Sequence, residues 1–243
     1  MSQHGKRYRQ ARAEIDRERA YSPLEAIQLL KGQEGAKFDE TVEVHMNMGL
    51  NVRHAEQQLR GTLMLPHGTG KDTRVAVFAE GEKAKEAQDA GADVVGSADL
   101  AKRIEEGFDE FDVAIATPDQ MANVGKLGRI LGPRGKMPNP KAGTVTFDVG
   151  KAVRDSKQGK LEYRTDRGAN VHLSIGRKSF DERQLLENYA AVVEEIVRAK
   201  PAAAKGRYIR SITLTASMGP GIHVDPQRTR GIAEEQEGAE AAA

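Results

Sequence analysis

The sequence predicts a protein of mixed α/β and α+β class, in which an antiparallel-sheet α+β domain is interrupted by an inserted Rossmann-like, three-layer α/β domain. Strand patterns with one polar face occur at residues 41–48 and again beyond residue 160. Between them, short apolar strands alternate with helical segments, which is typical of a parallel sheet covered by helices on both faces. We therefore expect residues 1–66 and 160–243 to form domain I and residues 67–159 to form domain II.

The overall composition limits the class of protein. The chain has 243 residues, enough for two modest domains. It has no apolar run as long as a membrane span, and its first ten residues, MSQHGKRYRQ, lack the apolar part of an export signal. Cysteine is absent, so neither a disulfide framework nor a thiolate metal site is expected. These features predict a cytoplasmic protein without a membrane partner.

The first part of domain I contains helical and strand signals in turn. Residues 4–20 combine a basic arm with a charge-alternating helix that has a thin apolar face. The sequence SPLE at residues 22–25 supplies the cap, first-turn proline and acid of a second helix start. Residues 41–48 alternate apolar and polar side chains, which predicts a strand with one solvated face. A short helix capped by Asn51 and a strand over residues 62–65 should follow.

Domain II is predicted from three apolar strands, each followed by helical sequence. The strands are expected at residues 75–79, 93–95 and 113–116, and the helices at residues 82–91, after a Ser97 cap, and from Thr117 onward. The last helix must end before Pro133, because proline disrupts a helix interior. This order predicts a parallel sheet between two helix layers.

Domain I resumes at Lys160 with two strands, residues 160–165 and 170–175. The sequence DRGA at residues 166–169 should join them as a hairpin. A final strand is expected over residues 208–215.

A long helix precedes that final strand. Ser179 is expected to cap it, an apolar stripe runs along it from Leu185 to Val197, and Pro201 should stop it after Lys200. The tail, residues 227–243, is acidic and alanine-rich, a composition typical of disorder.

No residue pattern indicates an enzyme. His67 to Lys71 follow a strand, as a phosphate loop does, but Leu65 stands where a Walker loop needs glycine and Asp72 where it needs a hydroxyl. The histidines lack metal-ligand spacing, and no nucleophile elbow occurs. We expect no cofactor, no metal ion and no small-molecule substrate. The competing hypothesis is an enzyme that uses the carboxyl edge of the parallel sheet.

The basic segment, residues 121–145, contains no acid. Its prolines and glycines alternate stiff with permissive backbone positions, which predicts a fixed loop. Preorganised cations suit a polyanion, since little conformational entropy is lost on binding. A structural connection with a solvated basic rim is the alternative. The cations are Lys126, Arg129, Arg134, Lys136 and Lys141.

Polar side chains of domain I form the second candidate surface. With a net charge of only +1, any polyanion site must come from local segregation of charge. If the strands pair in one sheet, hydroxyls and cations would share a face that can bind ribose and phosphate. Ordinary exposed β-forming residues are the alternative. The residues concerned are Lys37, Thr41, Glu43, Arg164, Asp166, Arg167, His172, Ser211, Thr213, Thr215 and Ser217.

Several segments resemble the large-subunit ribosomal protein L-one family, the proteins of the mobile ribosomal stalk. The segments are GRILGPRGKMPNPKAGTV at residues 128–145, RGTLMLPHGTGK at 60–71, KFDETVEV at 37–44 and SMGPG at 217–221, in the family's order. The resemblance runs from about Pro23 to Pro226. Two positions depart from the family: Lys136 replaces an apolar residue, and Ser217 replaces threonine.

This resemblance implies a discontinuous domain I that binds large-subunit rRNA, with an inserted domain swinging on a hinge near Pro66 and Gly159. It also implies binding to a similar structure in the mRNA of the protein's own operon, repression of that operon, and assistance to tRNA release from the exit site. The resemblance does not assign a role to the basic segment; our hypothesis is that Arg134, Lys136 and Lys141 face tRNA or brace the hinge. The implied RNA contacts are Lys37, Phe38, Thr41, Glu43, Ser217, Met218 and Gly219.

Overall fold

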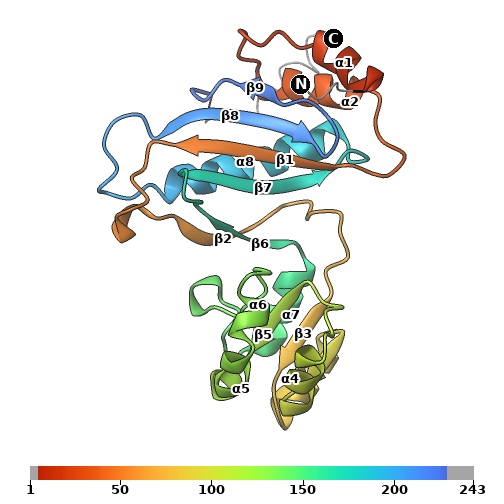
Figure 1. Cartoon of the computed structure of the whole chain (residues 1–243), viewed down its shortest axis with the longest axis vertical. Coiled ribbons are helices and arrows are strands. Elements are labelled where there is room, and N and C mark those ends of the chain that lie inside the picture. Colours follow the sequence, from red (N-terminus) through yellow and green to blue (C-terminus); the bar gives the residue numbers. More distant parts are fainter. Residues whose placement is uncertain (1–4, 229–243) are drawn as a thin grey trace. The chain divides into compact units, whose positions relative to one another are not determined.

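The structure, a computed structural model, describes residues 5–228. The chain forms two compact units, one made by residues up to Gly70 and from Tyr163 onward, the other by Lys71–Glu162. Each contains helices and strands, and the strands of the described residues form three sheets in all, which confirms the mixed α/β class (Figure 1). Of the tail expected at residues 227–243, the part from residue 229 onward lies outside the described residues.

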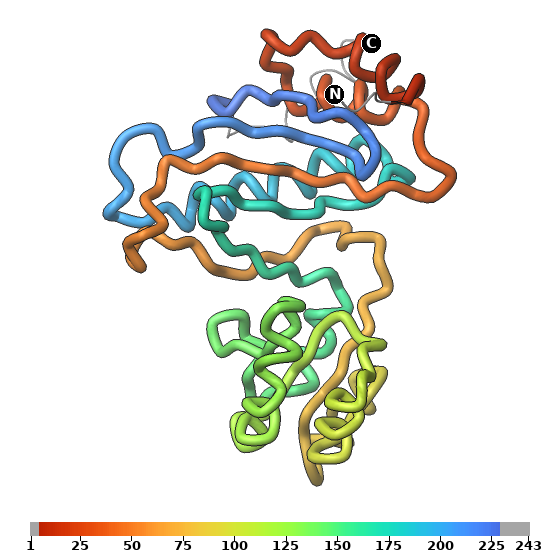
Figure 2. The backbone as a smooth tube through the Cα atoms, viewed as in Figure 1, coloured from red at the N-terminus to blue at the C-terminus, as the bar shows by residue number. Residues whose placement is uncertain are grey.

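The first unit is built on a four-stranded antiparallel sheet in the order β7-β1-β8-β9. Segments from both ends of this discontinuous unit therefore lie side by side, as the orange and blue parts of the tube show (Figure 2). A separate two-stranded sheet pairs β2 with β6; of β6, only Tyr163 and Arg164 belong to the first unit. The elements are α1 (Lys6–Ala13), α2 (Pro23–Gly32), β1 (Thr41–Met48), η1 (Ala55–Gln57), β2 (Arg60–Met64), β6 (Lys160–Arg164), β7 (Asn170–Arg177), α8 (Glu182–Arg198), β8 (Ile209–Ala216) and β9 (Ile222–Val224).

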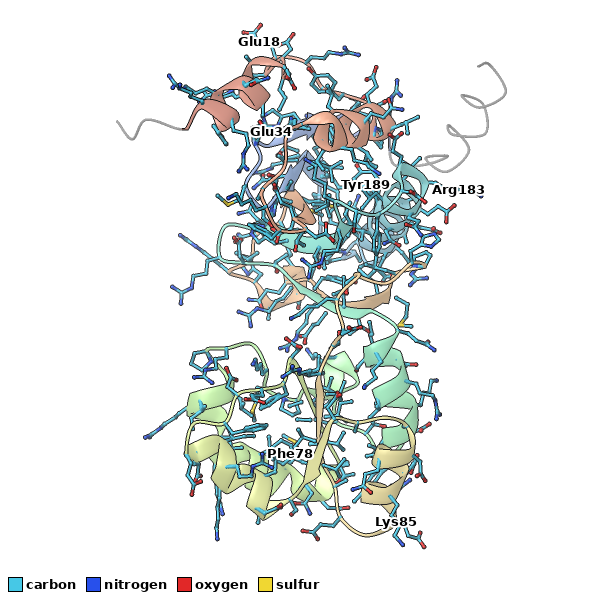
Figure 3. All side chains as sticks on the ribbon, turned by 90° about the vertical axis from the view of Figure 1, so that its right-hand side faces the viewer. Glu18, Glu34, Phe78, Lys85, Arg183 and Tyr189 are labelled. Atoms are coloured by element: carbon cyan, nitrogen blue, oxygen red, sulfur yellow. The ribbon has the colours of Figure 1, made fainter. Side chains whose placement is uncertain are left out.

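Helices cover one face of the four-stranded sheet. In β1 the side chains alternate between half-buried and fully buried, as predicted for a strand with one wet side. Helix α8 packs on β7 and α2 packs on β8 and β9, and the two helices contact each other. Tyr189 of α8 is fully buried in this core (Figure 3). Burial of the apolar face fixes the register, because a one-residue slip would turn every side chain over.

Three expectations for this unit are wrong. Residues 160–165 and 170–175 are not a hairpin, because β6 pairs with β2 while β7 pairs with β1. Asn51 does not cap a helix; its side chain accepts a hydrogen bond from the Arg53 N–H, and only the short η1 follows. The cap of α8 is Asp181 rather than Ser179, because Asp181 forms a capping box with Gln184.

The second unit is built on the parallel sheet β4-β3-β5. Val145 forms a further parallel bridge with Ala116, so the end of the basic segment runs along the sheet edge. The elements are β3 (Val75–Phe78), α3 (Glu82–Asp89), β4 (Val94–Gly96), α4 (Ala98–Glu105), β5 (Val113–Ala116), η2 (Pro118–Gln120), α5 (Met121–Lys126), α6 (Gly128–Leu131), η3 (Pro140–Ala142) and α7 (Val149–Lys157).

Helices pack on both faces of this parallel sheet. One core joins Phe78 of β3 to residues of α4, α5 and α6, and Figure 3 shows Phe78 in that layer. The other core joins Val75 and Val77 to α3 and α7. Successive residues of β3 thus point into different cores, which explains why the whole strand is apolar.

Two features of this unit differ from expectation. Ser97 stands at the N-cap of α4, but its hydroxyl does not cap the helix; it donates a hydrogen bond to Gln120 instead. Helix α7 was not predicted, although Asp148 caps it by accepting from the Lys151 N–H. The helix from residue 117 does end before Pro133, after passing through η2, α5 and α6.

Candidate nucleic-acid interface

The polar face of the first unit's sheet is organised in rows that cross the strands. Opposite residues in antiparallel strands share a face, so the register decides which side chains meet. The register therefore gathers the predicted residues of β1, β7 and β8 on the face that the helices do not cover. The rows are Arg177–Thr41, Ser174–Glu43–Thr215, His172–His45–Thr213–His223 and Asn170–Asn47–Ser211.

Hydrogen bonds link side chains along these rows. The Nδ1 atoms of His45 and His172 lie 2.8 Å apart, and the Oγ1 of Thr213 lies 3.2 Å from Nδ1 of His223. In the next row, Asn47 donates a 2.7 Å hydrogen bond to Asn170. The face is therefore a network of half-exposed polar side chains rather than independent groups. Neither His45 nor Asn47 was nominated from sequence, although strand alternation places both on the polar face.

One end of this face carries two of the segments that resemble the L-one family. Residues 37–40 lead into β1 and residues 217–219 follow β8, and the antiparallel pairing brings the two segments together. Phe38 and Met218 are 56% and 54% exposed, unusual values for large apolar side chains. Such side chains can pack against an unstacked base or a ribose. Lys37 is also exposed, and Gly219 is half-buried.

Ser217 joins the two segments through its backbone and its hydroxyl. Its N–H donates to the Thr41 carbonyl at 3.1 Å, and its Oγ accepts from the Thr41 N–H at 3.1 Å. The hydroxyl is therefore already engaged by β1. It fixes the start of the strand, in addition to any contact that it makes with a ligand.

Glu40 is a buried acid that the sequence did not single out. It is 3% exposed, and its carboxylate accepts hydrogen bonds from the N–H groups of Ala36 and Met218. A buried carboxylate needs such partners, because leaving it unpaired would be costly. Residues 39–41 have the sequence Asp-Glu-Thr. Asp39 and Thr41 point away from the core, so alternation along the chain could have placed Glu40 toward it.

Arg177 of β7 and Asp39 hold the start of β1 on the side that faces β7. Arg177 donates to the Asp39 carbonyl at 3.2 Å and to the Thr41 hydroxyl at 3.1 Å. The carboxylate of Asp39 accepts from both the N–H and the hydroxyl of Ser179. Arg177 was not predicted, yet it supplies a half-buried cation on the polar face.

The residues predicted around the expected hairpin are divided by the fold. Asp166 accepts from the N–H groups of Gly168 and Asn170, at 2.8 and 2.7 Å, and lies 3.4 Å from His172. Hydrogen bonds from Asn170, above all, lower the pKa of Asp166 to about 2. Arg164 lies on β6 and Arg167 at the exposed turn, so neither belongs to the four-stranded sheet.

The basic segment of the second unit divides into paired and exposed cations. Lys136 donates to the Asp109 carboxylate at 2.7 Å and to the Phe111 carbonyl at 2.5 Å, and its side chain is 19% exposed. Arg134 pairs with the same carboxylate at 3.0 Å. Lys126, Arg129 and Lys141 are exposed. Lys136 therefore holds its own unit together, although sequence alone suggested a ligand-facing cation.

Within residues 5–228, no three histidine, aspartate or glutamate side chains gather closely enough to hold a metal ion. No helix in that part of the chain is long and apolar enough to cross a membrane.

Comparison with known proteins identifies the family. The model of the ribosomal protein L1p/L10e family matches residues 29–220. A protein of Rubrobacter xylanophilus named large ribosomal subunit protein uL1 is 62% identical over 227 residues, which cover 93% of this chain and 99% of that protein. Proteins of the same name from Thermobifida fusca and Mycolicibacterium smegmatis are 61% and 56% identical, over 93% and 96% of this chain and 96% and 100% of their own lengths.

Proteins of this family are structural, non-enzymatic components of the ribosome in the cytoplasm. The matches cover both units and both segments at the end of the polar face. The chain therefore belongs to the ribosomal protein L1p/L10e family.

Proposed function

We propose that this chain is a structural constituent of the large ribosomal subunit that binds large-subunit rRNA through the polar face of its four-stranded sheet. The observation that carries the proposal is the register, which gathers hydroxyl, amide, imidazole and guanidinium groups on one uncovered face. Such groups bind ribose hydroxyls and phosphates while they recognise the shape of a folded RNA. The relatives named as large-subunit proteins support the choice of rRNA as the ligand.

Within this face, the end formed by residues 37–41 and 217–219 is the proposed centre of recognition. Phe38 and Met218 offer exposed apolar surface for bases, while Lys37 offers an exposed cation. Glu43 is the acid of the face, and a carboxylate cannot bind a phosphate. It can accept from a 2′-hydroxyl or a base amine, so it favours one folded RNA over other polyanions.

The remaining predicted contacts support this centre from the rest of the face. We assign Thr213, Thr215 and Ser211 of β8 to hydrogen bonding with ribose, and His172 to the middle of the face. Arg164 and Arg167 lie outside the four-stranded sheet, so they fit contacts to the flanking RNA backbone. Asp166 acts indirectly, because its carboxylate is occupied with the turn that positions His172.

We further propose that the two units act as separate domains, the inserted one a Rossmann-like three-layer unit, and that the protein assists release of exit-site tRNA. The exposed cations Lys126, Arg129 and Lys141 are the groups that fit a tRNA backbone. Arg134 and Lys136 fit that role less well, because Asp109 already neutralises them. Lys136 does not fit hinge bracing either, since its hydrogen-bond partners, Asp109 and Phe111, belong to its own unit.

The same polar face is proposed to bind the mRNA of the protein's own operon. An mRNA segment that reproduces the shape of the rRNA site would compete for the same side chains, and free protein would then repress translation. Competition between the two RNAs for one face is the direct consequence of this proposal.

Titration of the full chain with an unmodified stalk rRNA fragment tests the main proposal. We expect saturable binding at moderate salt, with a shallow salt dependence equivalent to about four to six phosphates. Replacing Phe38 by Ala should weaken binding, whereas replacing the exposed Lys126 by Ala should leave this affinity unchanged. Absence of saturable binding, or equal loss in both variants, would contradict it.

A second titration, with deacylated tRNA, tests the role of the second unit. Replacing Lys126, Arg129 and Lys141 together by Ala should weaken tRNA binding by the full chain and leave rRNA binding unchanged. Lys136→Met is the matched comparison, because it removes a cation that is already paired. If Lys136→Met weakens tRNA binding as much as the triple variant does, the exposed cations are not the binding groups.

A further inference from the structure

The row His172–His45–Thr213–His223 lies across the middle of the polar face, one side chain from each strand. Where β7 meets β1, the Nδ1 atoms of His172 and His45 lie 2.8 Å apart. Two such nitrogens attract each other only when one carries a proton and the other offers a lone pair. The two rings therefore share one proton at this contact.

The outer nitrogens of the same two rings face carboxylates. Nε2 of His45 lies 3.5 Å from Glu43, and Nε2 of His172 lies 3.4 Å from Asp166. Carboxylate oxygens only accept, so each Nε2 interacts favourably when it carries a proton. The chain of contacts thus uses three protons: one between the rings and one on each outer nitrogen. Two neutral imidazoles supply only two protons, so the network is complete when the pair carries one positive charge.

A second positive charge is excluded by the same geometry. Two imidazolium rings would place N–H donors against each other at the Nδ1 contact, and their charges would repel. The pair therefore alternates between zero and one charge under ordinary conditions. Because interacting sites titrate together, that single charge belongs to the pair rather than to either ring.

We propose that His45 and His172 form a one-proton site in the RNA-binding face, and that an RNA backbone lying over this row draws a proton onto the pair. The proposal rests on the rRNA-binding function proposed above. Phosphate charges stabilise a nearby imidazolium, so bound RNA favours the charged pair, and by linkage the charged pair favours RNA. The ligand is a nucleic-acid phosphate, and the proton is taken from solvent on binding.

The surrounding groups decide how strongly the free protein favours the neutral pair over the charged pair. Burial, and then repulsion from His172, lowers the pKa of His45, while Glu43 acts in the opposite direction. Thr213 and His223 continue the row on β8 and β9, and Arg177 is the further cation of the face on β7. Burial of His45 therefore disfavours the charged pair in the free protein, which leaves room for a proton to be taken up on binding.

The test is the pH dependence of the dissociation constant for the stalk rRNA fragment, measured with the full chain from about pH 8 to about pH 5.5. Binding should strengthen as pH falls, by at most about tenfold per pH unit for one proton. In His45→Asn and in the more exposed His172→Asn, this slope should flatten whatever affinity is lost at pH 8, because neither variant can form the one-proton pair.

His54→Asn is the matched control, because His54 is exposed and precedes η1, away from the strands of the face. It should keep the wild-type slope. The proposal is overturned if RNA affinity depends on pH in both pair variants as steeply as in wild type, even if RNA binding itself is strong. Loss of saturable binding in the wild type at every pH would instead overturn the proposed function.

Nuclear magnetic resonance of the free protein gives a readout that does not depend on RNA. The ring nitrogens of His45 and His172 should respond together to the uptake of one proton, with a second uptake delayed to much lower pH. Independent titration of both rings, each like an isolated histidine, would overturn the one-proton site.

Discussion

The carboxylate of Glu40 accepts a 3.0 Å hydrogen bond from the backbone N–H of Met218, across a sequence separation of 178 residues. Its other oxygen accepts from the N–H of Ala36. One buried acid thereby ties the segment before β1 to the segment after β8. The exposed Phe38 and Met218 project from those two segments. The most specific part of the proposed RNA interface thus depends on a residue that RNA need not contact.

Glu40→Ala should therefore affect both stability and binding. It leaves the partly buried N–H groups of Ala36 and Met218 without their acceptor, so the free energy of unfolding should fall by about 1 to 3 kcal/mol. RNA affinity should fall as well, because Phe38 and Met218 lose their common anchor. Denaturant unfolding and RNA titration measure the two effects. Glu34→Ala, at an exposed acid on the same segment, should change neither; unfolding curves that coincide for the two variants would contradict the anchoring role.

Comparison of Ser217→Ala with Ser211→Ala distinguishes a hydroxyl that stabilises the start of β1 from one that only contacts RNA. Ser217 is bonded to the backbone of Thr41, so its loss should lower the free energy of unfolding by about 0.5 to 1.5 kcal/mol and also weaken RNA binding. Ser211 is an exposed hydroxyl in the Asn47 row. Its loss should weaken RNA binding without lowering stability. Equal stability of the two variants would show that the Ser217 hydroxyl does not brace β1.

Lys136→Met should loosen the second unit locally. The Lys136 side chain reaches Phe111, with Nζ 4.9 Å from the ring centroid, and methionine is similar in length but loses the hydrogen bonds to Asp109 and to the Phe111 carbonyl. Backbone amides of β5 and of residues 109–111 should exchange with solvent faster, as measured by mass spectrometry of the full chain. Lys126→Met, at an exposed position, should leave this exchange unchanged. Unchanged exchange in Lys136→Met would mean that the ion pair contributes nothing.

The stability contributed by Asp166 should depend on pH. Its folded pKa is about 2, below the ordinary value of 3.8. Its contribution is therefore fully present above pH 3.8 and is lost as the pH falls toward about 2. Unfolding of wild type and Asp166→Ala should differ most near neutral pH and converge in acid. Glu18→Ala, at an exposed acid of the same unit (Figure 3), should show no such convergence, and a difference that does not vary with pH would contradict this assignment.

Most secondary structure could be predicted because local chemistry determines it. The SPLE sequence forms a complete capping box at the start of α2, and β1 alternates as expected over all its residues. Helix α7 and strand β9 were missed. Strand β9 has only the residues Ile222–Val224, and its place at the sheet edge comes from pairing with β8. A short segment of this kind carries too little local pattern to be recognised.

Pairing between distant segments could not be predicted from local pattern. The turn at residues 166–169 forms, with Ala169 at a φ of 61°, yet the strands on either side join different sheets. The sequence placed His45 on the polar face, but only the register sets it opposite His172. Likewise, nothing near Lys136 in the sequence indicates that Asp109 neutralises it. Long-range partners therefore decided which candidate cations remain available to a ligand.

Asn188 of α8 offers the sharpest test of how the first unit holds the segment after β2. Its side chain is fully buried; it accepts from the His67 N–H at 3.1 Å and donates to the carbonyls of Gly68 and Ile175 at 3.0 and 2.7 Å. Asn188→Leu would leave all three backbone groups unpaired, so the free energy of unfolding should fall by about 3 to 5 kcal/mol. Denaturant unfolding measures this loss.

Glu194→Leu is the control for Asn188→Leu, because Glu194 is an exposed residue of the same helix and leucine is equally compatible with a helix there. Hydrogen exchange should also rise at residues 67–68 in Asn188→Leu and stay unchanged in Glu194→Leu. Since Asn188 lies on the helix side of the sheet and Thr213 on the polar face, RNA affinity per folded molecule should be retained. A variant that is as stable as wild type would show that water replaces the amide, and that the buried contacts do not fix this segment.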